Sequence, residues 1–204
     1  MSSVSKAVSR GRPRSITPER ITTAGIEIGL SNITFVGVAA ALGVSHMALY
    51  KHVSSIEELK YMIAEEIFNR WQIPEPQVNE DNELKDYLIK FTLSLQQLIK
   101  SNVGLTPYII RRVATPASVM QKIHQHHQTI AQFYGLPIEK ARWLNATVAF
   151  HCIAVADTIY SVAGKEPVTQ TDRVIEEAEM EAEFNQSMYA LIIGALALVK
   201  DENI

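Results

Sequence analysis

The chain has 204 residues, a single cysteine, 47% apolar residues and a net charge of -3, the composition of an ordinary soluble chain with one large or two small domains. One cysteine excludes an internal disulfide, and with it a disulfide-stapled secreted scaffold. The longest apolar run, residues 188–199, has twelve residues and is shorter than the roughly 20 that span a bilayer. Residues 1–14 contain no apolar segment of the signal-peptide type. We therefore expect a cytoplasmic protein without a membrane span.

Positive charge is concentrated at the N-terminal end. Residues 1–55 contain six bases and two acids, a balance of +4, whereas the other 149 residues contain thirteen bases and twenty acids, a balance of -7. This asymmetry predicts two modules and makes a polyanion the candidate partner of the first. The alternative is a basic tail that serves only solubility.

The apolar periodicity predicts helices along the whole chain, and no stretch alternates with the period of a strand. The predicted helices cover residues 18–28, 35–42, 45–52, 56–71, 83–101, 107–113, 116–134, 138–163 and 172–200. Thr17, Thr106 and Thr115 each precede a proline, where a helix N-cap is expected. The acidic segment 72–82 contains two prolines and reads as a connection. We predict an all-α chain with two domains, residues 1–71 and 72–204.

Residues 34–53 have the pattern of a helix-turn-helix. The apolar positions of the first helix follow the spacing of one buried face and are Phe35, Val38, Ala39 and Leu42. Gly43 allows a tight turn, and the Ser45 hydroxyl can cap the next helix. Because that helix is too short to be stable alone, Leu49 and Val53, four residues apart, are expected to anchor it against the first.

The opposite side of this second helix carries His46, Met47, Tyr50 and Lys51, which lie within roughly 140° of one another at 3.6 residues per turn. This face contains no acidic residue. Polar and apolar groups near the helix N-terminus suit base edges, and donors further along suit phosphates. The pattern favours a helix that enters the major groove of DNA.

Residues 10–59 resemble the DNA-binding domain of the TetR family of bacterial transcription regulators. The segments ITPERI, AAALGVS and ALYKHV stand where the family has its first helix, its turn and its recognition helix. The remainder of the chain is similar only in helical architecture and length. The resemblance implies an N-terminal three-helix helix-turn-helix domain followed by a helical domain for ligand binding and dimerisation.

The predicted DNA contacts combine the helix pattern with this resemblance. They are Arg12, Arg14, Thr34, Ser45, His46, Met47, Ala48, Tyr50, Lys51 and His52. The resemblance assigns phosphate contact or helix orientation to Tyr50 and His52. It places His46, Met47 and Ala48 where bases are read. Basic arms of the kind that holds Arg12 and Arg14 can enter a minor groove.

The sequence departs from the family pattern in two respects. Ile56 stands where members usually have a phosphate-binding lysine, and Val36 and Gly37 stand where many have an arginine or another polar residue. Each lost phosphate contact weakens the salt-dependent part of DNA affinity, which the arginines of the arm can offset. The alternative is a three-helix core with incidental basic residues.

Two segments of the second domain, residues 142–163 and 188–199, are apolar almost all round and must be buried on most sides. Their small residues allow close approach, so the pair can form a four-helix bundle with the same pair of a second chain. The resemblance implies the same homodimer through the last two long helices. An intramolecular core is the alternative.

Polar residues within these apolar helices predict a pocket for a small-molecule effector. The candidate residues are Tyr108, Arg111, His124, His127, Phe150, His151 and Asp157. A metal site from the three histidines and Asp157 is conceivable, but no ligand pair has a known metal spacing. We therefore predict no metal and no cofactor. The resemblance implies a pocket without naming its occupant.

Together these features predict a ligand-responsive repressor that binds a pseudo-palindromic, double-stranded DNA operator as a homodimer and is released by a small-molecule inducer. An enzyme that uses His151 and Asp157 is the alternative from another class. The sequence contains no Gly-rich phosphate loop, no G-x-S-x-G and no H-E-x-x-H motif, so we expect no catalysis. A third reading is an architectural DNA-binding protein without an effector.

Overall fold

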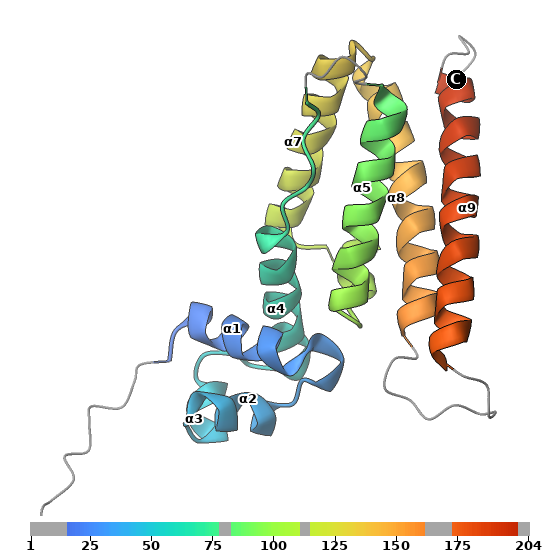
Figure 1. Cartoon of the computed structure of the whole chain (residues 1–204). Coiled ribbons are helices and arrows are strands. Elements are labelled where there is room, and N and C mark those ends of the chain that lie inside the picture. The colour runs from blue at the N-terminus through green and yellow to red at the C-terminus, as the bar shows by residue number, and fades with distance from the viewer. Residues whose placement is uncertain (1–15, 78–82, 111–114, 162–172, 200–204) are drawn as a thin grey trace, which may run out of the picture.

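The structure is a computed structural model that describes residues 16–77, 83–110, 115–161 and 173–199. The regular elements in these ranges are all helical (Figure 1). They are α1 (Pro18–Ile28), a 3-10 turn η1 (Leu30–Asn32), α2 (Phe35–Leu42), α3 (His46–Tyr50), α4 (Ile56–Arg70), α5 (Leu84–Ser101), α6 (Thr106–Ile110), α7 (Ala117–Tyr134), α8 (Ile138–Tyr160) and α9 (Arg173–Val199). The all-α prediction is confirmed, and the short turn η1 was not expected.

The helices form a small head and a larger body (Figure 1). The helices α1, α2 and α3 cluster at one end, and α4 packs against α1 at one end and α7 at the other. In the body, α5 and α8 form the central pair, α9 packs against both, and α7 packs against α8. The helix α4 is therefore the physical link between head and body.

The head is held by apolar side chains from all four of its helices. Ile21, Val38, Leu49 and Leu59 are completely or almost completely buried. A Cβ atom on Gly25 would lie 2.2 Å from Cδ1 of Ile63 on α4. Glycine at this position is what allows α1 and α4 to cross so closely.

Of the three threonines predicted to cap helices ahead of a proline, only Thr17 does so. The Thr17 side chain accepts a hydrogen bond from the backbone N–H of Arg20 at 3.3 Å. Thr106 is the first residue of α6 rather than its cap, and Pro116 occupies the cap position of α7 without a side-chain bond. The predictions for Thr106 and Thr115 were wrong, because tertiary contacts place Thr106 against α8 and Thr115 at a cavity.

Within the described residues, the last helix is long and apolar enough over Val174–Val199 to cross a membrane, by length and composition alone. Its buried residues form a stripe at helical spacing, namely Phe184, Met188, Ile192, Ala195 and Val199. This stripe packs on α5 and α8, as expected of a helix with one face on a protein core. Tyr189, Ile193 and Leu198 remain exposed.

Candidate functional site

The short helix α3 is built as the sequence predicts. Gly43 adopts the left-handed conformation at φ 70° and makes the turn from α2. The Ser45 hydroxyl accepts a hydrogen bond from the N–H of Ala48 at 3.2 Å. Leu49 and Val53 are 0% and 1% exposed, which confirms both as anchors. The Gly43 turn, the Ser45 cap and the two buried anchors therefore hold α3 in place. The helix has only five residues, a length that is not stable in isolation.

The outer face of α3 is exposed. His46, Met47, Tyr50, Lys51 and His52 are all solvent-accessible, and Ala48 is partly buried. The Tyr50 ring stacks on Phe35 of α2, with ring centroids 4.1 Å apart, so the hydroxyl is displayed from a fixed ring. This face carries donors and one large thioether, the groups suited to phosphates and base edges.

One further predicted contact, Thr34, stands at the start of α2 directly before Phe35, on which the Tyr50 ring stacks. Thr34 is exposed and caps α2, because its hydroxyl oxygen accepts from the N–H of Gly37 at 3.0 Å. Val36, where the family pattern has a polar residue, is 70% exposed. The arginines Arg12 and Arg14 lie outside the described residues.

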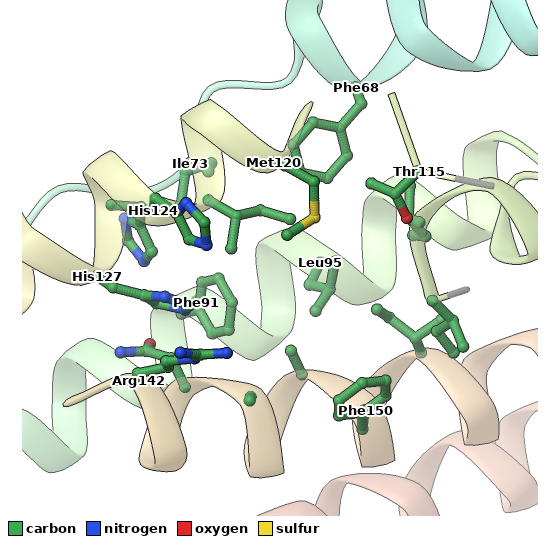
Figure 2. A pocket seen from close by; sticks show the side chains of 18 of the residues that line it. Phe68, Ile73, Phe91, Leu95, Thr115, Met120, His124, His127, Arg142 and Phe150 are labelled. Atoms are coloured by element: carbon green, nitrogen blue, oxygen red, sulfur yellow. The ribbon is translucent and has the colours of Figure 1, made fainter. Parts of the chain in front are cut away.

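The body contains a cavity of about 150 Å³ between the end of α4 and helices α5 to α8 (Figure 2). One wall is α7, with Met120, Ile123, His124, His126 and His127. The facing wall is α8, with Arg142, Asn145, Ala146, Ala149, Phe150 and Ile153. Phe68, Trp71, Ile73, Phe91, Leu95, Ile109, Ile110 and Thr115 complete the lining. The site is mostly apolar with a few convergent polar groups, as ligand pockets usually are.

The cavity includes His124, His127 and Phe150 among the predicted effector residues, and the lining does not include Tyr108, His151 or Asp157. His151 is exposed on the outer side of α8. Asp157 accepts a hydrogen bond from the Thr106 hydroxyl at 2.9 Å. The Tyr108 hydroxyl donates a hydrogen bond to the Glu57 carboxylate at 3.5 Å. Arg111 lies outside the described residues.

Arg142 and Asn145 are lining residues that the sequence reasoning did not select. With Ala146, Ala149 and Ile153 they form a stripe on α8 at helical spacing. That periodicity was visible in the sequence, but it does not say which of several stripes faces a cavity. Within the described ranges, no three His, Cys, Asp or Glu side chains gather as a metal ion would require.

Among the polar residues of the lining, His127 and Asn145 are buried, His126 is partly buried, and His124 and Arg142 are exposed. The Tyr87 hydroxyl and Nε2 of His126 are 2.7 Å apart and hydrogen-bonded. Burial lowers the pKa of His126 and of His127 to about 4, with a smaller contribution from neighbouring positive charge. Both imidazoles are therefore neutral at physiological pH. Two buried atoms of the lining, Nδ1 of His127 and Oδ1 of Asn145, have no hydrogen-bond partner among the residues that the structure describes.

The lowered histidine pKa values predict a stability that falls with acidification. The unfolded chain takes up protons near pH 6.5, whereas the folded chain resists until about pH 4, so the free energy of unfolding decreases as pH falls between these values. For His127 the loss between pH 7.5 and pH 5 is about 2 kcal/mol. Urea unfolding at several pH values measures it. His127→Gln should flatten the dependence, and an unchanged slope in that variant would contradict the assignment.

The head-bound helix α4 is tied to α7 beside the cavity. Nζ of Lys122 donates to the carbonyl oxygens of Phe68, Asn69 and Trp71 at 3.1, 2.9 and 2.5 Å. These carbonyls belong to the C-terminal end of α4, where a cation is favourable. The Ser118 hydroxyl also donates to Glu65. Because Phe68 and Trp71 line the cavity, the helix that packs against α1 of the head ends at the cavity.

The chain resembles known proteins in its three-dimensional structure. No family model and no curated protein sequence matches the chain. A TetR variant from Acinetobacter baumannii AYE, solved in complex with minocycline, superposes with a TM-score of 0.68 at 18% identity and covers 92% of this chain and 100% of its own. The TetR family protein ActR from Streptomyces coelicolor, in complex with actinorhodin, gives 0.66 at 19% identity, covering 92% and 99%.

A putative transcriptional regulator from Streptomyces coelicolor A3(2) superposes with a TM-score of 0.63 at 18% identity, covering 91% of this chain and 99% of its own. The match spans nearly the whole chain in all three cases, head and body together. Identities this low establish shared architecture rather than shared ligands or operators. The chain therefore has the fold of the TetR family of transcription regulators.

Proposed function

We propose that this protein is a ligand-responsive, DNA-binding transcription repressor of the cytoplasm. The exposed face of α3 carries the proposal, since it displays His46, Met47, Tyr50 and Lys51 from a helix locked by a cap and two buried anchors. Such a face fits the major groove, with Met47 near base edges and Tyr50 near phosphate. Arg12 and Arg14 would add minor-groove contacts.

A homodimer through α8 and α9 would present two such helices to the two halves of a pseudo-palindromic operator. Exposed apolar side chains on α9, namely Tyr189, Ile193 and Leu198, support this interface. On α8 the exposed Ala154 and Thr158 are small enough for close approach of a second helix. Exposed large apolar side chains are common at protein interfaces.

The cavity supports ligand response over a purely architectural role. Its lining includes Phe68 and Trp71 at the end of α4, and α4 also packs against α1 in the head. A ligand that binds one arrangement of α4 more tightly than the other would shift the spacing of the two recognition helices. The neighbours in complex with minocycline and actinorhodin are consistent with such a site.

The deciding experiment is selection of bound DNA from a random pool with the full-length protein. We expect an enriched site with two-fold symmetry and half-sites about one helical turn apart. Enrichment of a single asymmetric site would contradict the dimer, and no enrichment above the starting pool would contradict sequence-specific binding.

Two substitutions on α3 should affect the selected operator differently. Tyr50→Phe keeps the ring on Phe35 and removes only the hydroxyl, so we expect about five-fold weaker binding across all sequences at unchanged thermal stability. Met47→Ala should instead change base preference at particular positions, by about 1 kcal/mol or more per position. Fluorescence anisotropy with the operator and its single-base variants separates the two. If neither substitution alters binding, α3 is not the reading helix.

A further inference from the structure

The cavity has a polar end and an apolar end (Figure 2). His124, His127 and Arg142 lie together at one end, whereas Leu95, Thr115 and Phe150 lie toward the other. Phe91 lies near the polar end and offers an aromatic surface to whatever occupies the space. A molecule that matches the cavity would therefore have a mainly apolar part and a polar group at one end.

The hydrogen-bond capacity of the polar end is incomplete. Nδ2 of Asn145 donates to the carbonyl of Ala141 at 2.9 Å, which fixes the amide orientation because a carbonyl accepts only from the nitrogen. Oδ1 of Asn145 is then an acceptor without a donor, in a residue that is 1% exposed. A buried acceptor of this kind destabilises the free protein, so its presence in a cavity wall points to a donor supplied from outside.

The second unpaired atom is Nδ1 of His127, in a residue that is 9% exposed. Its ring is neutral at physiological pH and can present this nitrogen as donor or as acceptor. It therefore fits a hydroxyl or a carboxylate oxygen equally well. Asn145 is more selective, because a carboxylate has no hydrogen to donate to Oδ1.

Charge at the cavity favours an anion. The guanidinium of Arg142 is a permanent cation at the polar end, and none of the lining residues that the structure describes is acidic. Arg142 belongs to the exposed residues, which places it at the rim. Arginine binds carboxylates through two parallel hydrogen bonds.

Size restricts the apolar body. The cavity holds about 150 Å³, and an apolar cavity of about that volume accommodates one benzene ring. Fused ring systems would either require the walls to move apart or extend beyond the open side of the cavity, where Arg142 and Phe150 are exposed.

From these four observations we propose that the cavity is a binding site for a single-ring aromatic acid that carries a free hydroxyl. The carboxylate pairs with Arg142, the ring packs against Phe91, and the hydroxyl donates to Oδ1 of Asn145. The claim that this acid is the effector rests on the proposed function. The claim that the cavity binds such an acid does not depend on it.

The test is isothermal titration calorimetry of the full-length protein, without DNA, with benzoate, phenol, the three monohydroxybenzoates and 1-pyrenecarboxylate. We expect one hydroxybenzoate isomer to bind about ten-fold or more tightly than benzoate or phenol, because it alone satisfies both polar groups. The four-ring acid should bind about ten-fold more weakly than benzoate, if at all.

Two variants assign the contacts. Asn145→Leu should reduce the affinity of the preferred hydroxybenzoate to that of benzoate and leave benzoate within about three-fold, while the thermal midpoint of the free protein stays the same or rises. Arg142→Met should weaken benzoate and hydroxybenzoate by about five-fold and leave phenol unchanged. Gln128→Leu makes the same amide-to-leucine change at an exposed residue of α7 outside the lining, so it is the matched control and should change nothing. If Asn145→Leu does not fold, Asn145→Ala carries the same test.

The inference is overturned if no hydroxybenzoate binds saturably, or if Asn145→Leu weakens benzoate and hydroxybenzoate alike. Operator selection requires no ligand and calorimetry requires no DNA, so the two proposals fail separately. Binding with the expected selectivity but without any change in operator affinity would contradict the proposed ligand response and leave the site assignment intact.

Discussion

Leu49→Ala is expected to lower the free energy of unfolding by about 3 kcal/mol, within the range for buried leucine in a well-packed core. Leu49 is 0% exposed and belongs to a helix of five residues, His46–Tyr50. A helix of that length depends on its tertiary anchor, because it cannot form enough internal hydrogen bonds to stand alone. We therefore expect α3 to lose its fixed orientation and specific DNA binding to fall by about a hundred-fold or more.

Urea unfolding measures the stability loss, and hydrogen exchange of the amides of residues 46–53 measures the local loosening. Met47→Ala is the matched control, since Met47 lies on the same helix and is 62% exposed. Its cost should stay within about 0.5 kcal/mol. Equal stability of the two variants, or full protection of these amides in Leu49→Ala, would show that α3 is held by something other than its buried anchors.

Lys122→Met is expected to lower the free energy of unfolding by about 2 kcal/mol and to weaken the response of operator binding to the ligand. Nζ of Lys122 donates to three carbonyls at the end of α4, and hydrogen bonds to a charged group contribute more than neutral ones. Desolvation by burial lowers the pKa of this lysine, which partly offsets the gain and keeps the expected loss moderate. Methionine retains the length of the side chain and its packing.

Thermal unfolding and operator titrations with and without ligand measure both effects. Lys90→Met, an exposed lysine on α5, tests the same chemical change away from the junction and should leave stability within about 0.5 kcal/mol. A Lys122→Met protein that is less stable but responds fully to ligand would show that the link between α4 and α7 supports the fold without carrying the signal.

Local sequence was sufficient for the helix-turn-helix, whereas two of the three threonine caps predicted before prolines, Thr106 and Thr115, were wrong. The pattern of Phe35, Val38, Ala39 and Leu42 places α2 correctly, and Gly43 and Ser45 adopt the predicted turn and cap. The anchors Leu49 and Val53 are buried as expected. These features depend on residues within one or two helical turns, so their spacing along the chain carries the information.

The cavity was predicted less well. Polar residues within α7 and α8 marked the correct helices, yet His151 faces outward and Asp157 binds Thr106. Arg142 and Asn145, which line the cavity, were not selected. A helix that is apolar almost all round offers several faces of similar character, and periodicity alone does not say which face meets which neighbour.

The sequence by itself determined the all-helical class, the order and approximate ends of the helices, and which face of α3 is exposed, because each follows from local periodicity and capping. Only the tertiary structure decided which side chains share the cavity and which helix joins it to the head. Those properties depend on how α4, α5, α7 and α8 pack against one another over long separations in the chain. Packing also left Oδ1 of Asn145 without a donor, and the spacing of residues along a single helix cannot reveal an unpaired atom.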